Sequence, residues 1–562
     1  MVFRFSLFLF LLLTAFSNAS INNHSKLLHT TTQHPDTIVV QVFNFKTPSP
    51  TKEQDSKYST IVQFPKHSKW QKILMVQTIK CDESTNRDKY PCGEWDYFTE
   101  TIIKDENSGE DYQINSYITP YGKGLNLTEN GWEYVWDVTD YAPILTEKKQ
   151  ITHGNSQELH DLKFVFISGT PTRDVLKIEN IWPNGHYKYE KLALNSVLKQ
   201  QTIALIPEGK MFRIKSRISG HGHEGPYNCC EWDSKTHTLN IDGDNKFNWS
   251  VWKDCGHNPI HPQGGTWQFD RAGWCPGTAV DTYNFELTPY TSKKDSITID
   301  YAIEMFDDNG EKNGDYRMAH QLITYGEPNF NLDAALIETI SPNNALRYRR
   351  SVVFNDGTPV IKIKNNGQAP IKTISFNYGT KNGKTYTHKW YGYLDFLNET
   401  NITLPAITLE GLDNDIKFYV NIVKVNGEKD EQPQNNYNET NWTLPLIFPN
   451  KIVLEIVTGT PKRAKENSYM LLNSNGTVVR ALAQFPEEET IRERFDLEKG
   501  IYTFIIKDTN QDGMIQHWWK RNSDKNDVGK SGKILFFSDK GTPLQELPFD
   551  FADFYSFTFR VL

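Results

Sequence analysis

The alternation of hydrophobic and polar positions along the chain is typical of β-strands. It is plainest over residues 296–305, where apolar side chains occupy every second position: Ile297, Ile299, Tyr301, Ile303 and Met305. Successive side chains of a strand point to opposite faces, so this spacing predicts a strand with one buried face. Ile374, Phe376 and Tyr378 repeat the pattern, and Asn-Gly pairs typical of hairpin turns separate such runs. No long amphipathic helical pattern is present, and we therefore predict an all-β protein.

Strand-like runs recur at intervals of about ten residues, a spacing that favours β-sandwiches of jelly-roll or immunoglobulin-like type. The chain has 562 residues and is long enough for several domains. We place boundaries near Thr172, near Gly326 and within 445–450, where turns or Asn- and Gln-rich sequence interrupt the strands. The runs over 345–448 indicate an immunoglobulin-like accessory domain, and those over 450–562 indicate a C-terminal β-sandwich.

Residues 1–19 have the three parts of a secretory signal peptide. Arg4 supplies a charge, an apolar stretch follows, and small residues precede a cleavage position near Ala19. We expect the polar stretch that follows, 20–35, to be a flexible lead-in. A membrane anchor needs about 20 apolar residues, and no stretch of the sequence supplies them. We predict an exported protein, secreted, periplasmic or held at the cell surface, with no integral membrane segment.

Charge and composition exclude two further classes of protein. The formal net charge of −8 at pH 7 argues against a nucleic-acid partner, because nucleic-acid binding requires a basic face. Aromatic residues make up 13% of the chain, which excludes a disordered chain and suits half-buried strands or sugar-binding clefts.

All cysteines lie in the first half of the chain and form close pairs: Cys81 with Cys92, Cys229 with Cys230, and Cys255 with Cys275. Disulfides persist in exported proteins, so we predict that these pairs are bridged. A bridge between Cys229 and Cys230 would be strained, because adjacent Cα atoms lie only about 3.8 Å apart across a trans peptide bond. Zinc is the alternative, but the cysteines lack zinc-ligand spacing, as do His221 and His223 beside Cys229.

Two passages, CGEWD at 92–96 and CCEWD at 229–233, place acidic residues beside tryptophan. In an extended chain alternate residues share a face, so Glu94 and Asp96 would point together, opposite Trp95. An aromatic ring can stack on a sugar while a carboxylate accepts a proton or holds a water molecule. The passages therefore suit a sugar-handling or hydrolytic site. The alternative is a buried tryptophan with a solvated acid at a strand end.

A third passage, 265–277, is a glycine-bounded segment that contains an arginine, two tryptophans and a cysteine. Arg271 could hold a carboxylate in its ionised state through a two-pronged hydrogen bond. The alternative is a surface ion pair between Arg271 and Asp270.

Together these passages resemble the peptide N-glycosidase F family. The shared motifs follow one another in the family's order over about residues 37–325: CGEWD, SYITPYGKG, DVTDY, RISGHGHEGPY, CCEWDSKTHTLNID and DRAGWCPG. The resemblance implies two adjacent jelly-roll domains, over 36–172 and 173–326, with the site along their interface and no metal or cofactor. It also implies a monomeric bacterial hydrolase that acts on N-glycoproteins or glycopeptides. The implied reaction cleaves the bond between asparagine and the first N-acetylglucosamine and leaves an aspartate.

The resemblance further implies roles for individual residues. Asp96 matches the principal catalytic aspartate, Glu231 matches a glutamate that orients sugar and amide through water, and Arg271 matches the arginine that steadies this glutamate. The implied substrate-binding residues are Trp232, Arg271, Trp274, Trp95 and His221, the last standing where the family has a tryptophan.

The chain also departs from the family pattern. A second family glutamate lies in a Thr-Glu-Thr-Trp run, which reads Thr-His-Gly-Asn over 152–155 here, and Glu158 or Asp161 are candidate replacements. Tyr97 replaces an arginine that follows the catalytic aspartate, and Asp233 stands at a family cysteine position. The missing glutamate keeps open the alternative of a catalytically inactive glycan-binding protein. A glycoside hydrolase that cuts a sugar–sugar bond is a further alternative.

Residues 508–513, DTNQDG, begin like a calcium-binding loop. Position twelve would be Trp519, where such loops carry a glutamate. We therefore expect a β-turn with exposed acids and no metal.

Overall fold

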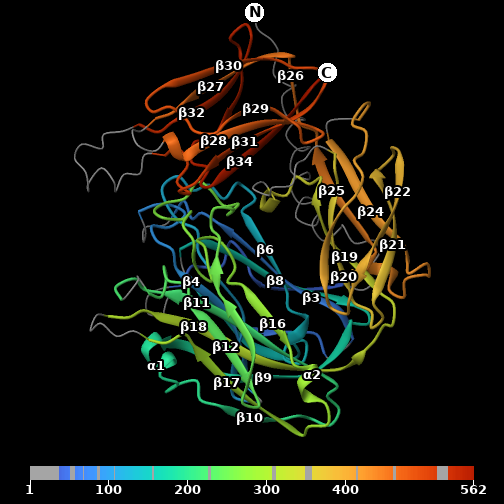
Figure 1. The fold of residues 1–562 in the computed structure, drawn as a ribbon. Coiled ribbons are helices and arrows are strands. Elements are labelled where there is room, and N and C mark those ends of the chain that lie inside the picture. Colours follow the sequence, from blue (N-terminus) through green and yellow to red (C-terminus); the bar gives the residue numbers. More distant parts are fainter. Residues whose placement is uncertain are drawn as a thin grey trace, which may run out of the picture. The chain divides into compact units, whose positions relative to one another are not determined.

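The computed structural model describes residues 37–50, 57–66, 69–84, 89–106, 108–154, 157–225, 229–306, 312–348, 357–412, 415–459, 464–515 and 530–562. The predicted signal peptide and lead-in lie outside these ranges. Nearly all regular structure within them is β-strand (Figure 1), which confirms the predicted all-β class. No helix among these residues is long and apolar enough to cross a membrane.

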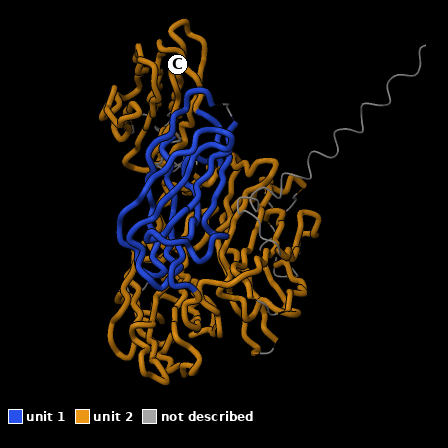
Figure 2. The backbone as a smooth tube through the Cα atoms, turned by 90° about the vertical axis from the view of Figure 1, so that its right-hand side faces the viewer, with its two compact units in different colours: residues 1–35, 330–344, 357–444 blue, residues 36–329, 345–356, 445–562 orange. Residues whose placement is uncertain are grey.

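The chain forms two compact units (Figure 2). The smaller unit holds the described residues of 330–344 and 357–444, and the larger unit holds the other described residues. Because the larger unit carries all the residues predicted for the site, its sandwiches are described first.

The first sandwich of the larger unit consists of two antiparallel four-stranded sheets. One has the order β1 (Thr37–Phe43), β8 (Leu159–Ser168), β3 (Trp70–Lys80), β6 (Trp132–Asp137); the other has β2 (Lys57–Gln63), β7 (Lys148–Gly154), β4 (Phe98–Asp105), β5 (Glu110–Ile118). Ile73 and Phe164 from one sheet and Ile151 from the other are fully buried in one core. Alternating apolar residues therefore hold the two sheets together.

The second sandwich has the same construction. Its sheets have the orders β10 (Gln201–Ala204), β17 (Ser296–Ile303), β12 (Thr236–Ile241), β13 (Asp244–Ser250) and β16 (Thr282–Glu286), β11 (Met211–His221), β18 (Asp315–Pro328), β9 (Arg173–Lys188). Short helices α1 (Tyr189–Ala193) and α2 (Thr288–Thr291) connect strands. The alternation predicted for 296–305 is confirmed up to Ile303. It is wrong for Met305, which is 74% exposed because the strand ends before it.

Polar side chains join the first two sandwiches. Arg217 on β11 donates from Nη1 to the carbonyl oxygen of Gln113 on β5 at 3.0 Å, and from Nη2 to the Tyr141 hydroxyl at 2.7 Å. Further along, the backbone N–H of Gly277 donates to the carbonyl oxygen of Ile118 at 2.8 Å. The end of β5 thus lies against a segment that follows Arg271 in the second sandwich.

A third sandwich completes the larger unit. Its sheets have the orders β26 (Leu446–Phe448), β34 (Phe554–Val561), β31 (Gly500–Asp508), β28 (Asn467–Asn473), β29 (Val478–Leu482) and β30 (Thr490–Asp496), β27 (Lys451–Val457), β32 (Lys533–Ser538), β33 (Pro543–Leu547). Phe504, Phe536 and Phe559 are fully buried between the sheets.

The smaller unit is also a sandwich. One sheet has the order β19 (Ala334–Ser341), β20 (Val360–Asn365), β23 (Glu399–Thr403); the other has β22 (Thr385–Leu394), β21 (Ile371–Thr380), β24 (Asp415–Val425), β25 (Tyr437–Thr443). Ile374, Phe376 and Tyr378 on β21 are buried in its core, as their alternation predicts.

The predicted disulfides Cys81–Cys92, Cys229–Cys230 and Cys255–Cys275 are all present. The zinc alternative is therefore wrong, because every cysteine sulfur is used in a bridge. The peptide bond between Cys229 and Cys230 is cis, and their Cα atoms lie 3.0 Å apart instead of at the trans separation assumed from the sequence.

Candidate active site

Asp96 lies on a loop of the first sandwich, between the Cys81–Cys92 bridge and the start of β4. Residues 94 and 95 form a bend rather than an extended chain. Backbone hydrogen bonds hold the loop: the N–H of Thr119 donates to the Tyr97 carbonyl at 2.9 Å, and the N–H of Gly122 donates to the Gly93 carbonyl at 3.0 Å. The chain after β5 therefore fixes the position of Asp96.

Glu231 lies on a turn of the second sandwich, directly after the Cys229–Cys230 bridge. Its N–H donates to the Gly222 carbonyl at 2.9 Å, and its carbonyl accepts the N–H of Ala272 at 3.0 Å. The second of these bonds joins Glu231 to β15 (Arg271–Ala272), which pairs with β14 (Trp252–Lys253). Glu231 and Arg271 thus lie on neighbouring stretches of backbone.

Arg271 is the most enclosed charged group of the site, with 1% of its surface exposed. Its Nε donates to Glu231 Oε1 at 3.1 Å, and its Nη2 donates to the Thr266 carbonyl and hydroxyl at 2.9 and 2.8 Å. The ring centres of Trp232 and Trp274 lie 4.3 and 4.7 Å from its guanidinium carbon. Arg271 therefore holds Glu231 through one nitrogen, not through the two-pronged bond expected from the sequence.

The alternative of a surface pair between Arg271 and Asp270 is not what the structure shows. Arg271 is buried, and Asp270 Oδ1 accepts the backbone N–H of Cys255 at 3.0 Å. The Cys255–Cys275 bridge closes the segment that carries both residues. Asp270 therefore helps to fix this segment, whereas Arg271 forms an ion pair with Glu231.

Asp96, Glu231 and Arg271 also interact electrostatically. Burial raises the pKa of Asp96, and the positive charge of Arg271 partly offsets that rise. Burial likewise raises the pKa of Glu231; Arg271 opposes the shift, and the Asp96 charge adds to it. The structure thus brings the two predicted acids together around one buried arginine.

The predicted aromatic residues have two different surroundings. Trp95, beside Asp96, is 59% exposed and presents its ring to solvent. Trp274 is buried: its indole N–H donates to the Gly220 carbonyl at 2.8 Å, and the His221 ring stacks on it at 5.5 Å. Burial, with the Arg317 charge, lowers the pKa of His221 well below its usual value. Trp95 is therefore open to solvent, whereas Trp274 packs against Arg271 and His221 packs against Trp274.

Neither candidate replacement for the second glutamate, Glu158 or Asp161, is among the charges that shift the pKa of Asp96 or Glu231. His153, which stands where the family has that glutamate, is fully buried in the first sandwich, with its Nδ1 2.9 Å from the Thr101 hydroxyl. Glu158 is also fully buried; burial, with the charge of Glu158, raises the pKa of Tyr117 and Tyr134. Asp161 lies on β8, paired with β3.

Sequence reasoning missed two residues that contact the site loops. Tyr121 lies close enough to Asp96 and Arg271 that both charges act on its hydroxyl, and burial raises its pKa. Gln157 lies under the loop of Asp96, where its amide donates to the carbonyls of Cys92 and Pro120, each at 3.3 Å. The SYITPYGKG motif pointed to Tyr121, but nothing local marks Gln157.

Fold and site together define an all-β protein in which loops of two joined sandwiches hold a pair of carboxylates around a buried arginine. A family model for the C-terminal part of peptide-N-glycosidase F matches residues 188–323. The chain is 30% identical over 290 residues to peptide-N(4)-(N-acetyl-β-D-glucosaminyl)asparagine amidase F of Elizabethkingia miricola. This match covers 47% of the present chain and 78% of the relative. The chain therefore belongs to the peptide N-glycosidase F family, and the resemblance found in its motifs is confirmed.

Two solved structures are similar to about half of the chain. PNGase F, a glycosylasparaginase from Flavobacterium meningosepticum, is 25% identical, with a TM-score of 0.44 over 52% of this chain and 96% of that one. PNGF-II is 15% identical, with a TM-score of 0.38 over 52% of this chain and 65% of that one.

Proposed function

We propose that this protein is an exported peptide N-glycosidase that hydrolyses the amide bond between an asparagine side chain and the first N-acetylglucosamine of an N-glycan. The observation that carries the proposal is the grouping of Asp96, Glu231 and Arg271 at one site. In this proposal, residues 1–19 direct export, and 36–172 and 173–326 are the jelly-roll domains that carry the site. The domains over 345–448 and 450–562 are accessory.

Asp96 is the group best suited to activate water. Amide hydrolysis needs a base near the attacking water and charge stabilisation as the tetrahedral intermediate forms. Burial raises the pKa of Asp96, which makes its carboxylate a stronger base than an exposed aspartate. The carboxylate takes a proton from water as the water oxygen bonds to the amide carbon. As the carbon–nitrogen bond breaks, Asp96 returns this proton to the leaving nitrogen, so that a glycosylamine departs and an aspartate remains in the peptide.

Arg271 and Glu231 orient the sugar end of the substrate. The Arg271 charge favours the ionised form of Glu231, whose carboxylate can accept hydrogen bonds from sugar hydroxyls or a bound water. Nη1 of Arg271 is buried and has no hydrogen-bond partner within the described ranges, so it can donate to a substrate or water oxygen. These donors and acceptors are held in place before substrate arrives, so they can stabilise developing charge without reorganising during the reaction.

Exposed aromatic rings beside Asp96 complete the proposal. Trp95 and Tyr97 are 59% and 43% exposed, on either side of the aspartate in the chain. Sugar rings carry apolar C–H faces that stack on such rings, so the pair can bind glycan or peptide next to the reacting amide.

The proposal is tested by incubating a denatured N-glycoprotein with the purified chain, with Asp96→Asn and with Glu129→Gln. Glu129 is an exposed acid of the same sandwich and serves as the matched control. We expect glycan release by the wild type and the control, and none by Asp96→Asn, whose nearly isosteric side chain should leave the fold intact. Equal release by Asp96→Asn contradicts the assigned role. Glycan binding without release by any variant indicates the inactive binding protein, and a sugar left on asparagine indicates a glycoside hydrolase.

A further inference from the structure

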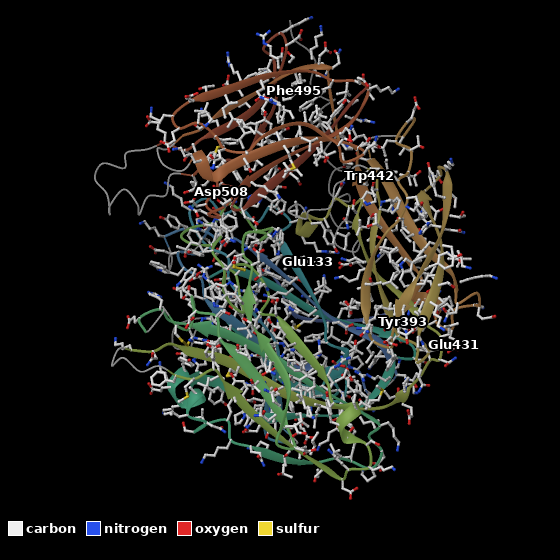
Figure 3. All side chains as sticks on the ribbon, viewed as in Figure 1. Glu133, Tyr393, Glu431, Trp442, Phe495 and Asp508 are labelled. Atoms are coloured by element: carbon white, nitrogen blue, oxygen red, sulfur yellow. A yellow bond between two sulfur atoms is a disulfide. The ribbon has the colours of Figure 1, made fainter. Side chains whose placement is uncertain are left out.

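Three carboxylates converge in the third sandwich of the larger unit, away from the site described above. Glu466 ends the short helix η7 (Ala464–Glu466), Asp508 ends β31, and Asp512 lies in the loop that follows (Figure 3 labels Asp508). Each offers a carboxylate oxygen within 4.8 Å of the others. Asp508 and Asp512 are 5% and 3% exposed, so the exposed turn expected from the sequence is wrong.

Asp508 has one oxygen that the described residues leave unused. Its Oδ1 accepts the backbone N–H groups of Asn510 and Asp512 at 2.7 and 3.3 Å. Its Oδ2 is buried and has no hydrogen-bond partner in the described part of the chain. A buried carboxylate oxygen without a partner is costly, and like-charged neighbours add to the cost. A cation bound among the carboxylates would remove both penalties.

The loop has the backbone of an oxygen-donor cation site. Asp508, Asn510 and Asp512 stand at the first, third and fifth positions, and Gly513 at the sixth has φ +57°, which suits the sharp turn at that point. A Cβ on Gly513 would lie 2.8 Å from the Phe549 carbonyl oxygen. The loop is therefore pressed against its neighbours at Gly513.

Glu466 supplies the acid that the local sequence lacks. Asn467 on β28 pairs with Asp508 on β31, and the N–H of Thr509 donates to the Glu466 carbonyl at 3.2 Å. This pairing brings a glutamate from another part of the chain to the carboxylate pair. Glu466 can thus take the ligand role that the residue at position twelve has in a continuous calcium loop.

We propose that Glu466, Asp508, Asn510 and Asp512 bind a calcium ion. The donors are all oxygens and three of them are carboxylates, a set that suits a hard divalent cation rather than zinc or copper. A donor set drawn from two chain segments favours Ca²⁺, which tolerates variable geometry, over Mg²⁺, which requires a near-ideal octahedron.

The proposed ion would also steady a contact with the segment that carries Arg271. Gln511, between two of the ligands, donates from Nε2 to Asp270 Oδ1 at 3.4 Å within the larger unit. Calcium binding would therefore fix the loop that presents Gln511 to the neighbour of Arg271. The ion itself takes no part in the proposed hydrolysis.

The test is calorimetric titration of the full chain, stripped with a chelator and dialysed, with calcium chloride. Asp508→Asn removes one ligand charge with little change of shape, and Asp539→Asn changes an exposed acid of the same sandwich as the control. We expect saturable binding by the wild type and Asp539→Asn, at least tenfold weaker binding by Asp508→Asn, and at least tenfold weaker binding of magnesium. Calcium should also raise the melting temperature of the wild type, but not of Asp508→Asn, by about 5 °C.

Absence of binding by the wild type at millimolar calcium overturns the proposal, as does equal binding by Asp508→Asn. Equal affinity for magnesium overturns the choice of ion. The heat of binding and the melting shift are read without substrate, so these outcomes do not depend on glycosidase activity.

Discussion

Replacing Arg271 with methionine removes a positive charge that acts on both acids of the site, so both stability and activity should fall. Arg271 is 1% exposed and makes hydrogen bonds to Glu231 and Thr266. Methionine fills similar space but carries neither the charge nor the donors. Glu231 would then keep a negative charge, 16% exposed, without its counter-ion.

The expected loss of stability is about 3 kcal/mol, because removing one partner of a buried ion pair leaves the other desolvated and unpaired. We take the lower end of the usual range because the Glu231 side chain retains some contact with solvent. The expected loss of kcat/KM is at least about 100-fold, the typical effect of removing one charge-stabilising donor.

The pH dependence gives the sharper test. Arg271 lowers the pKa of both Asp96 and Glu231, so its removal raises both pKa values. Because the proposed base must be ionised, the acid limb of the rate profile should move to higher pH. An acid whose folded pKa is raised holds its proton more tightly when folded, so the stability deficit should grow as pH rises through the interval between the unfolded and folded values.

The assay measures glycopeptide cleavage rates and urea unfolding across pH for the wild type, Arg271→Met and Arg492→Met. Arg492 pairs with Glu455 at the surface, where such a pair contributes about 1 kcal/mol or less, and it controls for loss of an arginine. A rate profile for Arg271→Met with an unmoved acid limb, or a stability equal to that of Arg492→Met, would refute the account of the site.

Three further variants test the loops and the aromatic surface. Gly93→Ala, at φ +87°, would place a Cβ 1.8 Å from Gln157 Cδ, so the Asp96 loop should shift and the cleavage rate should fall at least tenfold; a rate within twofold of wild type contradicts this. Trp95→Ala should raise KM with little change in kcat. Its free energy of unfolding should stay within about 0.5 kcal/mol of the wild-type value because the ring is exposed. Replacing Cys255 and Cys275 together by serine should lower the unfolding free energy by about 3 kcal/mol, since the bridge closes a separation of 20 residues; a melting temperature equal to wild type argues against it.

The strands could be predicted because their signal is local. Ile297, Ile299 and Tyr301 alternate with polar residues, and burial of one face of a sheet requires that spacing. The exact end of the strand could not be predicted: Met305 continues the alternation, yet β17 ends at Ile303 because its pairing with β12 ends there. Strand ends depend on the partner strand, which the sequence of one strand does not specify.

The site could be predicted only as far as its motifs extend. Asp96, Glu231 and Arg271 each lie in a short acidic or aromatic passage, and family resemblance joined them. Gln157 supports the Asp96 loop from a segment with no such motif, since its contacts depend on how β8 and the loop pack together. The prediction of a two-pronged bond from Arg271 to a carboxylate was also wrong, because its Nη2 donates to the Thr266 carbonyl instead.

The cation loop shows the same limit. Its first half is visible in the sequence, and the missing acid at position twelve made an exposed turn the better expectation. Glu466 meets Asp508 only because β28 and β31 are neighbours in a sheet. Sheet order, not local sequence, decides which distant acid comes close.

Mass spectrometry of a denatured N-glycoprotein digested in heavy-oxygen water shows directly whether water is added at the asparagine amide. We expect aspartate at each released site, carrying one heavy oxygen, and a free glycan that retains both core N-acetylglucosamine residues. Asp96→Asn should leave the glycopeptide intact. An asparagine that keeps one sugar residue, or a glycopeptide unchanged by the wild type across pH and glycan types, would contradict the account.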